Sequence, residues 1–158
     1  MKNFYAFLVL LLVGHFSFGQ ITENFDTGLS GSYTTGSQTL TSGTWETVQV
    51  ITEAVGDSRG GTGSAARIND DEAGASITTP TLSGAGVVSF WYRELNTGGG
   101  TFALQTSTDG TNYTTQTTQA FSGTTYAQFT YTLNDTSSNL TIRILNDFQP
   151  GHLIIDDF

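Results

Sequence analysis

The sequence contains no cysteine, and this absence excludes several kinds of chemistry. A chain without cysteine has no disulfide, no thiol nucleophile and no thiolate ligand for zinc. Of its two histidines, His15 lies near the N-terminus, which leaves His152 as the only imidazole in the body of the chain. One imidazole, without a serine in an elbow motif, gives no support for a catalytic triad. The fold must therefore depend on its core, its sheet hydrogen bonds and any bound metal.

Positive charge is also scarce. Five basic residues face 14 acidic ones, for a net charge of −9, and the only lysine is Lys2. Without Lys2, four arginines remain and the net charge is −10. An acidic surface without lysine argues against binding nucleic acid or an anionic membrane, because both depend on contacts between basic side chains and phosphate.

The hydrophobic run near the N-terminus is short. It extends from Phe4 to Val13 and follows Lys2, and small residues Ser17 and Gly19 precede Gln20. This pattern predicts a cleavable signal peptide over residues 1–19 and a secreted mature chain over 20–158. The run is too short for a transmembrane helix, so we expect no membrane span in the mature chain.

Helical periodicity is missing after residue 20, and the whole chain has only two prolines. Short β-forming runs alternate instead with glycine, asparagine and aspartate. We expect strands at Ile21–Phe25, Trp45–Thr52, Ala65–Asn69, Ala75–Thr78, Val87–Leu95, Thr101–Thr108, Thr114–Ala120, Ala127–Leu133, Leu140–Asn146 and Leu153–Phe158. Such a series predicts an all-β fold, an antiparallel β-sandwich of the jelly-roll type.

The densest β-forming stretch is GVVSFWYRELN, from Gly86 to Asn96. Side chains alternate between the two faces of a strand, so Val88, Phe90 and Tyr92 share one face. We assign that face to the core. Trp91 lies on the opposite face. Further aromatic residues after this stretch, Tyr113 among them, supply core-sized groups that a disordered Thr/Ser/Gly-rich stalk would lack.

Three arginines occur in similar positions, since Arg67, Arg93 and Arg143 each stand near the end of an expected strand. If these strands share a sheet, the three arginines line one surface together with Trp91. An aromatic ring beside planar guanidinium donors is typical of sugar binding, because the ring stacks on C–H groups while the donors bind hydroxyls or a carboxylate. The alternative interpretation is that each arginine pairs with a nearby carboxylate and that Trp91 packs under a loop.

Several short motifs follow one another in a recognisable order. They are Asn24-Phe25-Asp26, Trp45, Gly63–Arg67, Ile77–Leu82, Phe90-Trp91-Tyr92 and Ile154–Phe158. This order resembles that of MAM domains and of the wider jelly-roll group of extracellular adhesion and carbohydrate-binding modules. The disulfide cysteines of MAM domains are missing, which favours the wider group.

The phrase FWYRELNTGGGTFALQTSTDGTNY and the predicted leader also resemble jelly-roll modules in secreted proteins of Bacteroidetes-type bacteria. The resemblance implies a module that does no chemistry itself and that accompanies a secreted hydrolase. Because the chain stops inside an expected strand, we expect it to be the N-terminal part of a longer protein.

The resemblance also implies that the first and last strands are neighbours. It would then bring together four carboxylates, those of Glu23, Asp26, Asp156 and Asp157. Carboxylate oxygens are the ligands that Ca²⁺ prefers, so this set is the candidate for a structural calcium site. The alternative is that these carboxylates are solvated charges.

The sequence favours a non-catalytic module for adhesion or for binding a glycan or another cell-surface ligand. One alternative is a small glycan-active enzyme that uses two carboxylates, for which Glu46, Glu53 and Glu94 are available although nothing marks a pair. Another alternative is a spacer domain without a ligand.

Overall fold

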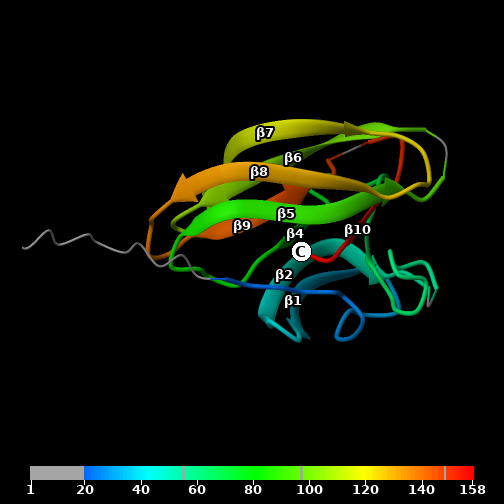
Figure 1. Cartoon of the computed structure of the whole chain (residues 1–158), viewed down its shortest axis with the longest axis horizontal. Coiled ribbons are helices and arrows are strands. Elements are labelled where there is room, and N and C mark those ends of the chain that lie inside the picture. Colours follow the sequence, from blue (N-terminus) through cyan, green and yellow to red (C-terminus); the bar gives the residue numbers. More distant parts are fainter. Residues whose placement is uncertain (1–19, 55, 97, 148) are drawn as a thin grey trace, which may run out of the picture.

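The computed structural model describes residues 20–54, 56–96, 98–147 and 149–158, so the predicted signal peptide lies outside the described residues. This part of the chain contains strands and turns but no helix (Figure 1). The strands are β1 (Thr34–Leu40), β2 (Gly43–Thr52), β3 (Ala66–Ile68), β4 (Ser76–Thr78), β5 (Ala85–Glu94), β6 (Gly100–Ser107), β7 (Thr114–Phe121), β8 (Ala127–Asp135), β9 (Thr141–Leu145) and β10 (Leu153–Asp156).

Antiparallel hydrogen bonding joins the strands in the order β7-β6-β9-β4-β2-β3-β10-β5-β8, and β1 pairs with β2 beside this path. The sheet curls into a β-sandwich of the jelly-roll type (Figure 1). We call one layer the β6 layer; it consists of β7, β6, β9, β4 and the first part of β2. The other, the β5 layer, consists of the last part of β2 with β3, β10, β5 and β8.

Strand β2 belongs to both layers. Its residues 46–48 pair with β4, whereas residues 50–52 pair with β3. Between them, Gln49 has a φ of 53°, in the left-handed region. The register between β1 and β2 shifts at the same place, and the Gln49 amide donates to Thr35 Oγ1 at 3.2 Å. A bulge of this kind bends and twists a strand, which lets β2 pass from one layer to the other.

Aromatic rings from both layers fill the core. The ring of Phe90 lies 4.9 Å from that of Phe129 and 5.5 Å from that of Phe102, centroid to centroid. Phe90 and Val88 are buried and Tyr92 packs against the same cluster, so the core face predicted for this strand is confirmed. Burying a side chain of this size stabilises the fold by about 1.5–3 kcal/mol.

The two ends of the described chain are neighbours. Two backbone hydrogen bonds, of 2.9 and 2.8 Å, join Glu23 to Phe158. The expected strand Ile21–Phe25 is nevertheless wrong as a strand, because this segment forms only that one isolated pairing. The sequence also missed β1, whereas the other nine strands correspond to expected ones. No helix in the described residues is long and apolar enough to cross a membrane.

Candidate functional site

Two of the three predicted arginines share a surface with Trp91. Arg67 on β3 and Arg93 on β5 both pair with Ile154 of the intervening strand β10. Trp91 stands two residues before Arg93 on the same strand. All of them are on the outer face of the β5 layer, as the sequence predicted for this part of the surface.

The loop between β2 and β3 covers this outer face. Only 7% of the Arg93 surface is exposed to solvent, and its guanidinium forms an ion pair of 3.3 Å with Asp57 of that loop. The guanidinium of Arg59, from the same loop, lies 4.5 Å from the centre of the Trp91 ring. Ile154 is completely buried. A ligand would have to displace the loop to reach this surface.

Arg67 is also paired with a neighbouring carboxylate. It forms an ion pair of 3.1 Å with Glu53, and its guanidinium lies 5.4 Å from the centre of the Tyr33 ring. Tyr33 in turn contacts His152, which pairs with Asp70 at 3.0 Å. Burial raises the pKa of the Tyr33 hydroxyl. Paired arginines and packed aromatics were the alternative interpretation of this surface, and the contacts agree with it.

Arg143 does not join the other arginines, and the expectation that all of them line one surface is wrong on this point. It lies on β9 in the β6 layer, where its neighbours along the chain, Ile142 and Ile144, point into the core. Side-chain alternation therefore places Arg143 on the outer face of the other layer. The sequence could not reveal the position of Arg143, because the order of the strands in the sheet, and not the pattern within each strand, decides which residues share a layer.

The outer face of the β6 layer carries a row of polar side chains across five strands. Strand register places them next to one another in the order Glu46, Thr78, Arg143, Gln105, Thr115. With about 4.8 Å between neighbouring strands, the row extends over about 19 Å. We call these five residues the polar row.

Hydrogen bonds organise the centre of the polar row. Nε and Nη2 of Arg143 both donate to Oε1 of Gln105, at 2.8 and 2.6 Å. Nε2 of Gln105 donates in turn to the Thr115 hydroxyl at 2.9 Å. This chain of contacts fixes the orientation of the guanidinium plane, because two N–H groups on one edge of the guanidinium converge on a single oxygen that is itself held in place.

Tyr113 lies over Arg143. The guanidinium carbon is 3.7 Å from the centre of the ring, and the Tyr113 hydroxyl is 3.4 Å from that of Thr141. The prediction that Tyr113 is a core residue is wrong, because its ring is half-buried and lies over Arg143 on the outer face. A cation so close to an aromatic ring is attracted to its electron-rich face.

The turn before Tyr113 explains its placement. The carboxylate of Asp109 accepts hydrogen bonds from the Asn112 side chain at 2.7 Å and from the amides of Thr111 and Asn112 at 2.8 and 2.7 Å. These donors hold the pKa of Asp109 well below its usual range, the Asn112 side chain most of all. The sequence Thr108-Asp109-Gly110-Thr111 is typical of a hairpin turn, and Tyr113 is the first aromatic residue after it.

Arg143 differs from the other described arginines in its charge balance. Arg59, Arg67 and Arg93 each form an ion pair with a carboxylate. Within the described part of the chain Arg143 forms none, although it is half-buried. Burial lowers the pKa of its guanidinium, and the nearby Tyr113 and Asp147 only partly oppose this effect. A partly desolvated cation without a counter-charge is costly in free energy.

The four carboxylates predicted to hold Ca²⁺ lie in one region. Glu23, Asp26 and Asp157 line a hollow of about 620 Å³. Asp156 is almost fully buried; burial raises its pKa, as do the charges of Asp157 and Asp26. The neighbouring ends of the chain produce this arrangement, as the resemblance implied.

Backbone donors occupy several of these oxygens. Oε2 of Glu23 accepts the amide and the hydroxyl of Ser42 at 2.8 and 2.7 Å, and Oδ1 of Asp26 accepts the Ser64 amide at 2.9 Å. Among the residues that the structure describes, no three acidic or imidazole groups converge as a metal site would require. Calcium binding stays a prediction, and it would require these carboxylates to exchange N–H donors for the ion.

The carboxylates considered for glycoside hydrolysis do not form a pair. Glu94 is buried and accepts the amides of Gly99 and Gly123 at 2.7 and 2.9 Å. Glu53 pairs with Arg67 in the β5 layer, while Glu46 lies in the polar row of the β6 layer. Glycosidases need two carboxyl groups on either side of one bond, and these three face different surroundings.

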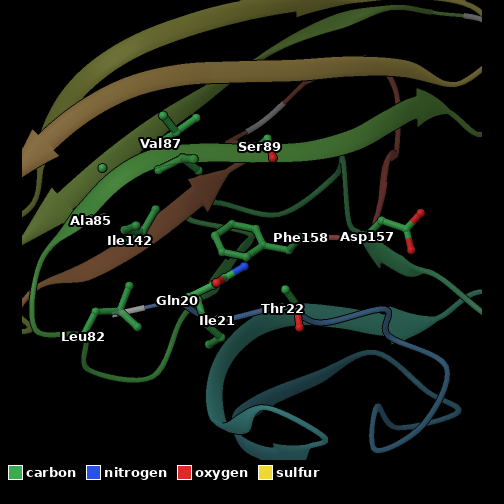
Figure 2. A pocket seen from close by; sticks show the side chains of 12 residues that line it. Gln20, Ile21, Thr22, Leu82, Ala85, Val87, Ser89, Ile142, Asp157 and Phe158 are labelled. Atoms are coloured by element: carbon green, nitrogen blue, oxygen red, sulfur yellow. The ribbon is translucent and has the colours of Figure 1, made fainter. Parts of the chain in front are cut away.

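A second candidate site is a hollow of about 540 Å³ beside the start of β5, lined by both apolar and polar residues. In Figure 2 the ring of Phe158 lies between β5 and the segment that contains Gln20 and Thr22. Val87, 60% exposed, stands at its edge. Its volume is typical of ligand pockets, and Gln20, Thr22, Ser89 and Asp157 add polar side chains to its apolar lining. We place the candidate site on the polar row instead, because Tyr113 and Gln105 both contact the Arg143 guanidinium there.

Neither a protein-family model nor a curated protein matches this sequence. Solved structures do match the fold. The CBM22-1–GH10 modules of the Clostridium thermocellum xylanase 10B, complexed with xylohexaose, share 16% identity with a TM-score of 0.57, over 87% of this chain and 27% of that one. The chain thus spans about a quarter of that structure's length.

Two smaller structures match over most of their own length. TmCBM61, in complex with β-1,4-galactotriose, has 16% identity and a TM-score of 0.51, over 72% of this chain and 84% of that chain. The K2 cleaved adhesin domain of Lys-gingipain has 14% identity and a TM-score of 0.62, over 86% and 94%. At these identities the likeness establishes a shared jelly-roll fold, in agreement with the fold class that the sequence predicted.

Proposed function

We propose that this protein is a non-catalytic carbohydrate-binding module whose ligand lies along the polar row of the β6 layer. One observation carries this proposal. Tyr113 and Gln105 both contact the Arg143 guanidinium, so that an aromatic ring and planar donors are held together on the outer face of the β6 layer. No carboxylate of the described residues forms an ion pair with this guanidinium. Sugars present both C–H faces and hydroxyls, and this combination of groups binds both.

The fold likeness supports the same function. Two of the matching structures are described as complexes of carbohydrate-binding modules, one with xylohexaose and one with β-1,4-galactotriose. The first of them joins such a module to a GH10 module in one chain. By analogy we propose an extracellular module that is accessory to a hydrolase elsewhere in a longer protein. The likeness to an adhesin domain fits attachment to a surface glycan.

The polar row would bind a glycan across the strands. The exposed hydroxyl of Thr115 and the remaining N–H groups of Arg143 can exchange hydrogen bonds with sugar hydroxyls, and the half-buried ring of Tyr113 supplies apolar contact. Because Gln105 and Arg143 are already held in place, binding orders few side chains and costs little conformational entropy.

The test is the affinity of the purified protein for xylan, galactan and uronate-containing polysaccharides, measured by calorimetry. We expect binding in this panel, and Tyr113→Ala should weaken it by about tenfold or more, since it removes the aromatic contact. Tyr126→Ala is the matched control, because Tyr126 is also half-buried over an arginine, 5.3 Å from Arg93, but in the β5 layer. It should leave the affinity unchanged.

The same incubations also test the absence of catalysis. We expect no release of reducing ends from any polysaccharide. If the protein releases products and Glu46→Gln abolishes this release, the protein is an enzyme rather than a binding module. If it binds nothing in the panel, it is a spacer. Near-ultraviolet circular dichroism confirms that both tyrosine variants are folded.

A further inference from the structure

The glycan that fits this site carries negative charge. We infer that Arg143 binds an anionic substituent of the polysaccharide, a uronate carboxylate or a sulfate ester, through the edge of its guanidinium that faces away from Gln105. This inference rests on the proposed function and names the class of its ligand.

Arg143 is the exception to the charge pairing of this protein. The chain has 14 acidic residues, and three of the four arginines after the leader have found one as a partner. Arg143 has none within ion-pair distance in the described residues, although carboxylates outnumber arginines more than threefold. Buried or half-buried charges are normally paired, so an unpaired arginine on an acidic protein indicates that its partner comes from outside.

The guanidinium of Arg143 also has donors to spare. Nε and Nη2 are engaged with Gln105, and no protein acceptor contacts Nη1 in the described structure. Arginine carries five N–H donors, so the outer edge retains donors for a second fork. Two parallel N–H groups match the two oxygens of a carboxylate or sulfate.

The guanidinium of Arg143 is held in place from two sides. The Tyr113 ring at 3.7 Å covers one face of it, and Gln105 fixes its plane. Its neighbours in the polar row are neutral, and Asp147, whose charge acts on it, forms no ion pair with it in the described residues. Glu46 lies two strands away, and its negative charge would repel a second anionic group of the ligand at that end of the row.

The experiment compares polysaccharides with their neutralised products on the unmodified protein. Glucuronoxylan and polygalacturonate are each compared with their carboxyl-reduced products, and a sulfated galactan with its desulfated product. We expect at least one anionic form to bind about 10–100-fold more tightly than its neutral product, as charge-assisted hydrogen bonds predict. Which pair shows the difference distinguishes carboxylate from sulfate.

Variants assign the preference to one residue. Arg143→Met should abolish the preference for the anionic form, while Arg59→Met, which removes an exposed arginine from the loop between β2 and β3, should retain it. Equal affinity for charged and neutral forms would overturn this inference and leave the proposed function intact. A preference that survives in Arg143→Met would overturn the assignment to Arg143, and binding to no form of any polymer would overturn the proposed function itself.

Discussion

Two aspartates show how local surroundings set the charge behaviour of one residue type. Asp109 is exposed and accepts several N–H and O–H donors, which lower its pKa. Asp156 is almost fully buried, and burial together with the neighbouring charges of Asp157 and Asp26 raises its pKa. The ordinary pKa of both is 3.8 in the unfolded chain. Their contributions to stability must therefore change with pH in opposite directions.

The sign of each change follows from proton binding. For Asp109 the folded state releases the proton more readily, so its stabilising contribution is present above pH 3.8 and disappears as the pH falls. For Asp156 the folded state binds the proton more tightly, so its contribution grows as the pH falls through the raised pKa towards 3.8.

Thermal unfolding of Asp109→Asn and Asp156→Asn between about pH 3 and pH 7 tests this pair. The stability of wild type relative to Asp109→Asn should shrink as the pH falls. Relative to Asp156→Asn, the stability of wild type should increase over the same range. Parallel pH profiles for both variants would contradict the assignment of opposite pKa shifts.

At the scale of elements, β2 is the strand that joins the two layers, and Gln49 is its turning point. Only glycine adopts a positive φ without steric cost, whereas β-branched residues are the least suited to it. The φ of 53° at Gln49 therefore strains the backbone, and this strained conformation lets β2 pass from one layer to the other.

Replacement of Gln49 tests this strain. Gln49→Gly should raise the free energy of unfolding by about 1 kcal/mol, because the left-handed conformation then costs nothing. Gln49→Val should lower it by a similar amount or more, in chemical denaturation monitored by tryptophan fluorescence. Both variants keep the backbone amide that bonds to Thr35. A valine variant as stable as the glycine variant would show that residue 49 is not left-handed.

Strands were predictable where they are rich in β-forming residues, as for the core face of β5. β1 escaped prediction because its sequence, TTGSQTL, has one large apolar residue. It forms because β2 supplies a full ladder of partners and Leu40 reaches the core. The segment Ile21–Phe25 was predicted as a strand but does not form one. Its apolar residues favour a strand, but Phe25 has a φ of 56°, which interrupts an extended backbone.

At the scale of the whole molecule, the class of fold followed from the sequence but the site did not. The prediction combined Arg143 with Arg67 and Arg93, and the register separates them onto opposite outer faces of the sandwich. Only the strand order brings Gln105 beside Arg143, and Arg143 in turn lies under Tyr113. The covering of Trp91 depends on a long loop whose path no periodicity specifies.

The two layers therefore have different roles in this account. The outer face of the β5 layer is closed by its own loop and ion pairs, and it stabilises the fold. The outer face of the β6 layer leaves Arg143 without a carboxylate partner among the described residues and presents ordered donors to solvent. The proposed glycan site lies on the second of these faces.

The most direct test is a map of backbone amide chemical shifts during titration with xylohexaose and with glucuronoxylan oligosaccharides. We predict that the shifts concentrate on β6, β9 and the turn before Tyr113, with Gln105 and Arg143 among the amides that move most. Shifts confined to the β5 layer around Trp91, or to the hollow beside Val87, would contradict the account, as would a spectrum that neither oligosaccharide changes.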